Sequence, residues 1–213
     1  MCVIIMERNK NMTKSELTNA WLSNPDGATI GWVNSREGEI YRGIMTLNDY
    51  LKLYAGLPKK GLFIHHFRYG TSGAKIKGLT HNFPLIKTED ISVFDKTYFK
   101  LKKGDEMMFL SHNGILNNWE SDYEKLKPIL GFPEIAETEL SDTKYLAMVY
   151  NFAKIGLDEF KKILKKYGGK YTILKVGEAY SIGGFIQYKK DAEVKVSNTY
   201  SFERRWSYSF YDF

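Results

Sequence analysis

The sequence predicts an α+β fold built from two mainly antiparallel sheets, with helices packed outside them. Three observations lead to this prediction. Segments of strand character come in groups that helical segments separate, without the regular strand–helix alternation of a parallel sheet. Residues 28–34 and 39–43 are strand-like and are joined by a short segment that favours a hairpin loop. Apolar runs at 61–68 and 107–110 are short and end in polar residues, as buried strands do.

Helix signals are clear at several places. Thr13 and Glu16 have the spacing of a capping box, and the helix that follows should end at the turn residues 24–27. A second helix is expected over 46–54, with Thr46 and Asp49 at its start. Ser141 is an N-cap candidate with Asp142 in the first turn. Further helices are predicted at 120–126, 141–153 and 157–167, and further strands at 171–176, 179–186 and 193–200.

The length of 213 residues and the absence of a linker-like segment predict one domain over residues 1–213. The segment 202–213 is an aromatic-rich C-terminal tail. It is either a final strand that completes a sheet or a docking segment for a partner, and the sequence does not separate these readings. With one cysteine no internal disulfide can form, which favours a reducing compartment. No apolar run is long enough to span a membrane, so a cytoplasmic protein is expected.

The formal charge of +6 permits contact with nucleic acid but does not favour it. The clearest basic cluster, within residues 161–166, alternates with apolar residues and is typical of the solvated face of an amphipathic helix. The sequence has no zinc-ligand spacing, phosphate-binding loop or dinucleotide fingerprint, so neither a metal nor a cofactor is expected.

Cys2, the only cysteine, directly follows Met1. Removal of Met1 would leave a thiol and a free α-amine on one residue. Their reference pKa values, about 8.5 and about 7.7–8.0, make proton transfer from sulfur to nitrogen nearly balanced. This is how an N-terminal amine activates its own nucleophile. The alternative is that Cys2 is a small apolar residue without chemistry.

Polar residues at the ends of predicted buried segments offer groups that suit an amino-acid substrate. Arg68 could hold an α-carboxylate with its guanidinium fork, and Asp142 could accept from an α-ammonium. The Asn113 amide and the Gly114 N–H could stabilise an oxyanion. Each residue also has a structural alternative: an ion pair for Arg68, a tight turn for Asn113 and Gly114, and a helix cap for Asp142.

Six motifs in order give this chain a resemblance to the class II glutamine amidotransferase domain, a family of N-terminal-nucleophile hydrolases. They extend over roughly the first 150 residues. The matching segments are Cys2 after Met1, residues 24–28, 66–73, 82–85, 112–115 and 141–143.

The resemblance implies a four-layer αββα sandwich and a reaction in which Cys2 attacks the side-chain amide of glutamine. Ammonia would leave, and water would hydrolyse a γ-glutamyl thioester. By carry-over, Arg68 and Asp142 would bind the substrate, and Asn113 and Gly114 would form the oxyanion hole. Gly27 and the segment that contains Thr71 would shape the pocket.

Three functions are compatible with these residues. The first is a glutaminase that passes ammonia to a separate synthase or synthetase. The second is a free-standing amidohydrolase that cleaves a γ-glutamyl or related amide without transferring nitrogen. The third, a non-catalytic binding protein on the same scaffold, is disfavoured because the whole residue set is present.

Overall fold

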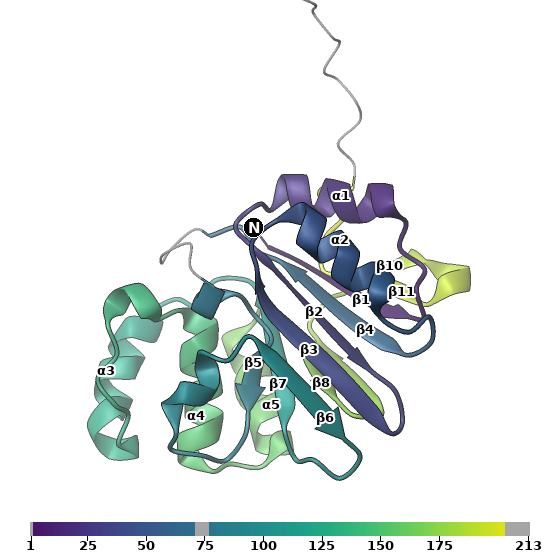
Figure 1. Cartoon of the computed structure of the whole chain (residues 1–213). Coiled ribbons are helices and arrows are strands. Elements are labelled where there is room, and N and C mark those ends of the chain that lie inside the picture. The colour runs from purple at the N-terminus through teal and green to yellow at the C-terminus, as the bar shows by residue number, and fades with distance from the viewer. Residues whose placement is uncertain (1, 71–76, 203–213) are drawn as a thin grey trace, which may run out of the picture.

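The computed structural model describes residues 2–70 and 77–202. Within these ranges the strands form two antiparallel sheets, a large sheet of seven strands and a small sheet of four (Figure 1). The large sheet has the order β10 (Ile186–Lys189), β11 (Val194–Val196), β1 (Val3–Arg8), β4 (Leu62–Phe67), β2 (Ala28–Val33), β3 (Glu37–Ile44), β6 (Tyr98–Lys102). The small sheet has the order β5 (Phe83–Leu85), β7 (Met108–Asn113), β8 (Lys170–Lys175), β9 (Glu178–Ile182).

Helices cover the outer faces of both sheets (Figure 1). On the large sheet lie α1 (Lys14–Ser23) and α2 (Leu47–Gly56), and on the small sheet lie α4 (Asp142–Ala153) and α5 (Leu157–Tyr167), while α3 (Trp119–Leu130) packs against α4. Short 3-10 helices occur at Lys77–Leu79, Ile91–Phe94, Glu137–Glu139 and Lys190–Ala192. The predicted four-layer αββα sandwich of two mainly antiparallel sheets is therefore confirmed.

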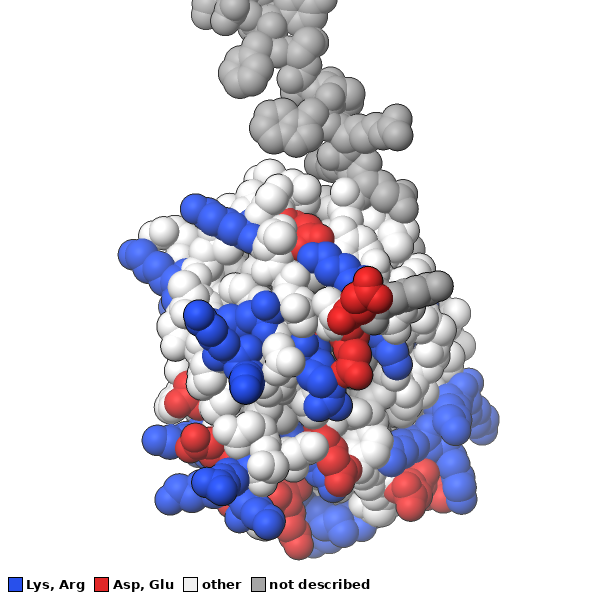
Figure 2. Space-filling model, turned by 90° about the vertical axis from the view of Figure 1, so that its right-hand side faces the viewer, with Lys and Arg blue, Asp and Glu red and all other residues white. Residues whose placement is uncertain are grey.

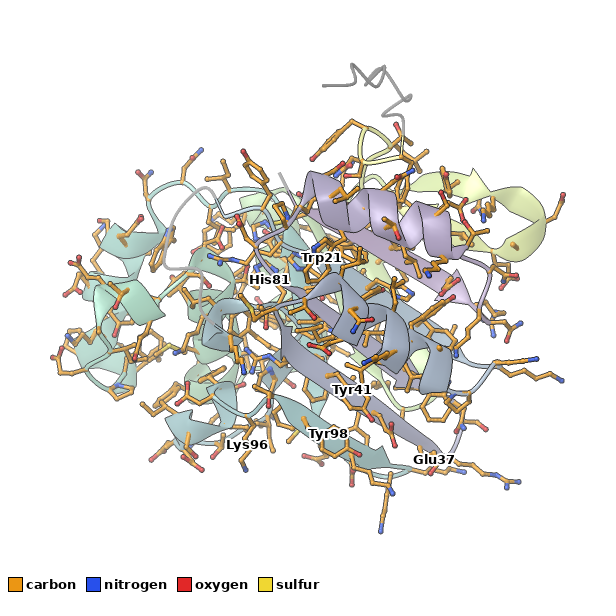
Figure 3. All side chains as sticks on the ribbon, turned by 45° about the horizontal axis from the view of Figure 1, so that its top comes forward. Trp21, Glu37, Tyr41, His81, Lys96 and Tyr98 are labelled. Carbon is orange, nitrogen blue, oxygen red and sulfur yellow. The ribbon has the colours of Figure 1, made fainter. Side chains whose placement is uncertain are left out.

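Two apolar cores hold these layers together. One lies between the large sheet and its helices. Figure 3 shows Trp21 on the side of α1 that faces this sheet, where its ring packs against Tyr50 of α2 and Phe67 of β4. The other core fills the space between the sheets and continues beneath the helices of the small sheet. Because β-strand side chains alternate between faces, β1 and β4 contribute to both cores.

A buried polar cluster lies inside the core under α2. The Glu7 carboxylate accepts hydrogen bonds from Tyr54 Oη at 2.8 Å and from the backbone N–H groups of Asn11 and Met12. His65 Nε2 lies 2.9 Å from the same carboxylate, and both side chains are fully buried. Burial disfavours the charged form of Glu7, but these partners hold its pKa below the ordinary value. The loop after β1 is thus fixed to α2 by a buried anion.

Most predicted elements are present, with the following main differences in their bounds. The strand predicted over 179–186 ends at Ile182 as β9 of the small sheet, and Ile186 begins β10 of the large sheet. The strand predicted at 107–110 continues through Asn113, because Ser111 and the two residues after it pair with β8. The strand predicted over 193–200 covers only Val194–Val196. The helix predicted to end at Leu126 continues through Pro128 to Leu130. Gly131, in the left-handed conformation, then ends it.

Basic side chains lie among acidic ones on the face shown in Figure 2. Several basic residues are held in short-range ion pairs on helices, including Lys161 with Asp158 and Lys162 with Glu159. The predicted amphipathic helix at 157–167 is confirmed as α5, with Phe160 and Leu164 buried. Among the described residues, no helix combines the length and the apolar character needed to cross a bilayer.

Candidate active site

The alternation of β1 directs Cys2 into the space between the sheets. Val3 and Ile5 belong to the core under the helices, whereas Ile4 and Met6 pack in the core between the sheets. Cys2 stands two residues before Ile4 and therefore faces the small sheet. Because β1 lies between β4 and β11 in the large sheet, neighbouring strands hold the segment that directly follows Cys2 from both sides.

The Cys2 side chain lies in a pocket at one end of the sandwich. The backbone N–H of Tyr69 donates to Cys2 Sγ at 3.4 Å, and the thiol lies 3.7 Å from the Tyr69 carbonyl oxygen. Burial raises the pKa of the Cys2 thiol, and the hydrogen bond with Tyr69 and the charge of Arg68 offset this only in part. The pocket is lined by Cys2, Arg68, Tyr69, Gly70, His81, His112, Gly114, Ile115, Trp119, Ser141 and Asp142.

Arg68 follows directly after β4, and its backbone is fixed on both sides. Its N–H donates to the Gly27 carbonyl at 2.9 Å, and its carbonyl accepts from the Asp26 N–H at 3.0 Å. The Asp26 carboxylate accepts from the Gly70 N–H at 2.8 Å. Burial lowers the pKa of Arg68, while the charges of Asp26 and Asp142 act in the opposite direction. The pocket therefore contains a nearly buried guanidinium among carboxylates, a setting that suits a substrate with charges of both signs.

Asp142 begins α4, where the Ser141 side chain caps the helix by accepting from the Lys144 N–H at 3.2 Å. The Asp142 carboxylate accepts from the Leu116 N–H at 3.2 Å and lies 3.5 Å from His112 Nδ1. Burial alone would raise the pKa of Asp142, but the hydrogen bond and charge of His112 and the Leu116 N–H hold it below its ordinary value. Asp142 is thus an anion that reaches the pocket.

The two residues predicted to form an oxyanion hole are placed differently. Gly114 lines the pocket beside Cys2. Asn113, the last residue of β7, is nearly buried, and its Nδ2 atom donates to Ser197 Oγ at 2.8 Å. Its amide nitrogen is therefore directed to the segment after β11 and not into the pocket.

Three buried histidines, His66, His81 and His112, adjoin the site, and none of them was predicted as a functional residue. His66 and His81 stack with their ring centroids 3.9 Å apart, and Figure 3 shows His81 in the middle of the molecule. The backbone N–H of His112 donates to His81 Nδ1 at 3.2 Å, so His81 carries its proton on Nε2, which lies 3.5 Å from Thr143 Oγ1. Thr143 Oγ1 in turn donates to Asp142 at 3.1 Å. Burial lowers the pKa of His66 to about 3 and that of His81 well below its usual range.

The structure thus brings Cys2, Arg68, Gly114 and Asp142 to one pocket. Gly27 lies behind Arg68 and has a φ of +108°, which favours glycine. Thr71 lies outside the described residues. Within residues 2–70 and 77–202, no group of three or more His, Cys, Asp or Glu side chains is placed to hold a metal ion.

Comparison with solved structures finds similar folds. Glutamine phosphoribosylpyrophosphate amidotransferase from B. subtilis, complexed with ADP and GMP, matches 95% of this chain with a TM-score of 0.63 and 19% identity. A structure described as the allosteric regulatory enzyme of purine biosynthesis matches 95% of the chain with a TM-score of 0.62 and 18% identity. This chain has the fold of their matched portions.

The resemblance to the class II glutamine amidotransferase domain is therefore confirmed at the level of the fold. The chain spans 43% of the length of each of these two structures. No family model matches the sequence, and the search against curated proteins gives no match.

Proposed function

We propose that this chain carries the glutaminase reaction of a class II glutamine amidotransferase, with Cys2 as the nucleophile. The observation that carries the proposal is the pocket in which the thiol meets a guanidinium and a carboxylate supplied by separate elements. Arg68 follows β4, whereas Asp142 begins α4. A zwitterionic α-amino acid presents one charge to each of these groups, which leaves its side-chain amide for the sulfur.

The reaction requires removal of Met1, so that Cys2 bears a neutral α-amine. The amine takes the proton of the thiol as Sγ bonds to the amide carbon of glutamine. The Gly114 N–H stabilises the oxyanion of the tetrahedral intermediate. The protonated amine then gives its proton to the leaving nitrogen, and ammonia departs as the C–N bond breaks. A water molecule attacks the thioester, the amine accepts its proton, and glutamate leaves as the thiol is restored.

The raised pKa of Cys2 supports the need for an internal base. Burial keeps the thiol protonated near neutral pH, so a proton acceptor must be present in the same place as the sulfur. His112 and His81 line the pocket, but both are engaged with Thr143. The α-amine of Cys2 itself is the base that the proposal assigns.

The test is ammonia release from glutamine by purified protein whose N-terminus has been determined by mass spectrometry. Activity should be proportional to the fraction of chains without Met1. Cys2→Ala should abolish it, and a glutamine analogue with an electrophilic side chain should alkylate Cys2. Failure of fully trimmed protein to release ammonia or to form a thioester with glutamine would exclude the glutaminase. A γ-glutamyl amide would then be the substrate to test.

The proposed reaction produces ammonia inside a pocket, which a separate synthase or synthetase would consume. Three large apolar side chains near the site are partly exposed, namely Tyr69, Ile115 and Tyr200. Tyr69 and Ile115 line the pocket, and the pKa of Tyr200 is raised by partial burial and, to a smaller extent, by the charge of Cys2. Such a surface suits the docking of an ammonia acceptor. Co-purification followed by transfer of nitrogen from labelled glutamine would identify this partner.

A further inference from the structure

Ser197 lies at the point where the nucleophile strand, the small sheet and the C-terminal segment meet. It directly follows β11 and is fully buried. Its Oγ atom accepts from the backbone N–H of Ile4 at 2.9 Å and from Asn113 Nδ2 at 2.8 Å. One hydroxyl therefore joins β1, two residues after Cys2, to the amide that was expected to contribute to the oxyanion hole.

The hydrogen bonds around Ser197 can be arranged in a second way. A serine hydroxyl can accept two hydrogen bonds and donate one. As it stands, Oγ accepts twice, while Asn113 Oδ1 is buried without a hydrogen-bond partner among the described residues. The two ends of a carboxamide have nearly the same shape, so rotation by about 180° fits the same space. Ser197 then donates to Oδ1, and Asn113 Nδ2 takes the buried position that Oδ1 holds now.

We propose that Ser197 is a positioning residue that holds the Asn113 carboxamide in this second orientation during the reaction. The inference rests on the proposed glutaminase function. In that orientation the buried acceptor is satisfied and the Nδ2 donor is left for the oxyanion beside the Gly114 N–H. Ser197 makes no contact with the substrate and acts only through Asn113.

The segment after β11 also fixes the nucleophile, so Cys2 and Asn113 are both held by hydrogen bonds to Ser197 and Asn198. Asn198, the next residue, donates from Nδ2 to the Cys2 carbonyl at 2.9 Å. The Ser197 backbone N–H donates to the Ile4 carbonyl at 2.9 Å. Because β1 is bonded to this segment on both sides of Val3, the backbone of Cys2 and the side chain of Asn113 are attached to the same two residues, Ser197 and Asn198. A change in Ser197 should therefore affect the chemical step more than substrate binding.

Steady-state kinetics with glutamine test the proposal through Ser197→Ala and Ser197→Thr. Alanine removes the hydroxyl, and kcat should fall roughly tenfold to a hundredfold, less than the effect of losing an oxyanion donor outright. KM should change less than about twofold, because Arg68 and Asp142 are untouched. Threonine keeps the hydroxyl and should restore part of kcat. An unchanged kcat in Ser197→Ala, or a rise in KM alone, would overturn the proposal.

Ser201→Ala is the matched control. Ser201 is a second fully buried serine of the same segment, and its Oγ accepts from an asparagine amide, Asn24 Nδ2, at 3.0 Å. Its loss should leave kcat within about twofold of the wild type. Combination with Asn113→Ala gives a further criterion. If Ser197 acts through Asn113, then Ser197→Ala has no additional effect on kcat in the Asn113→Ala background. Equal effects in both backgrounds would overturn the proposal.

A measurement without glutamine separates this inference from the proposed function. The side-chain NH₂ resonances of Asn113 in an NMR spectrum report the environment of Nδ2. Ser197→Ala should shift them, and Ser201→Ala should not. If the wild type releases no ammonia, the glutaminase function fails, and a shift confined to Ser197→Ala still supports the orienting contact. Unchanged Asn113 resonances in Ser197→Ala would overturn that contact whatever the activity.

Discussion

Asn198 donates a hydrogen bond of 2.9 Å to the carbonyl oxygen of Cys2, although 196 positions separate the two residues. This bond closes the large sheet around the nucleophile candidate, since β11 pairs with β1 just before it. The first strand by itself would present Cys2 at a free chain end, where backbone fraying is the rule. Ser197 and Asn198, which directly follow β11, are therefore part of the site, even though neither residue lines the pocket.

Replacing Asn198 by alanine should loosen Cys2 without removing a group that contacts the substrate. Loss of one hydrogen bond is worth about 1 kcal/mol, so kcat should fall roughly fivefold to tenfold. Rates of ammonia release measure this effect. Asn34→Ala is the control, because it removes side-chain hydrogen bonds to the N–H groups of Arg36 and Glu37 in a distant hairpin. Equal activities of the two variants would mean that the bond to Cys2 is not needed.

Replacing Arg68 by lysine should weaken glutamine binding while preserving charge. Lysine cannot form the two parallel bonds of a guanidinium to a carboxylate, and a hydrogen bond to a charged group is worth about 1.5–3 kcal/mol. The KM for glutamine should rise roughly tenfold to a hundredfold. Arg8→Lys is the control, because Arg8 pairs with Glu193 at the surface. A KM equal to that of the wild type would remove Arg68 from substrate binding.

Local signals in the sequence predicted most of the elements. The capping box of Thr13 and Glu16 forms as expected, and Thr46 caps α2 by accepting from the Asp49 N–H. The predicted α5 has the bounds Leu157–Tyr167. These features depend on residues within one helical turn of each other, so their spacing in the sequence contains the necessary information.

Pairing between distant segments was not predictable in the same way. The short β11 is a strand because it adds to β1, and nothing local marks where it ends. Likewise, β7 continues to Asn113 because β8 lies opposite its polar end, with His112 paired to Tyr171. The polar character of residues 111–113 suggests a loop when the partner strand is unknown. Register of this kind is fixed by the tertiary fold.

In the site, too, some residues were predictable from the sequence and others depend on contacts between distant segments. Cys2, Arg68, Gly114 and Asp142 were predicted as one group, and they line one pocket. The contribution of Ser197 and Asn198 was missed, because a serine–asparagine pair near a chain end has no specific signal. His81 precedes a segment used for the resemblance, and an isolated histidine between polar residues gives no indication of its burial.

Acid should destabilise the protein through His66, whose pKa burial lowers to about 3. The unfolded chain binds a proton at His66 below about pH 6.5, whereas the folded chain does not until about pH 3. The free energy of unfolding therefore falls by about 1.4 kcal/mol per pH unit in this window from His66 alone. His66→Gln removes this proton while keeping an amide donor for the His112 carbonyl.

Urea unfolding between pH 7 and pH 4 measures the difference. The slope of the unfolding free energy against pH should be smaller in His66→Gln by about one proton. His81 is present in both proteins, and burial, the largest cause of its lowered pKa, acts on it in both. Parallel curves for the two proteins would show that His66 is protonated to the same extent in the folded and unfolded chains.

Replacing Gly114 by alanine should abolish most of the activity through a clash with His112. A Cβ atom at position 114 would lie 2.6 Å from His112 Nε2 and 3.3 Å from the Gly169 Cα atom. The His112 ring is buried and stacks on Tyr171 with centroids 4.5 Å apart, so it has little room to withdraw. The backbone at Gly114 must shift instead, which displaces an oxyanion donor. We expect kcat to fall by roughly a hundredfold or more.

Gly56→Ala provides the matched comparison for this substitution. A Cβ atom at Gly56 meets nothing within 4 Å, so the same chemical change is accommodated without displacement. Activity of Gly56→Ala should equal that of the wild type. The decisive measurement is the pre-steady-state rate of thioester formation, since the Gly114 N–H is used when the tetrahedral intermediate forms. If Gly114→Ala forms the thioester at the wild-type rate, the N–H does not stabilise that step, and the oxyanion must be held elsewhere in the pocket.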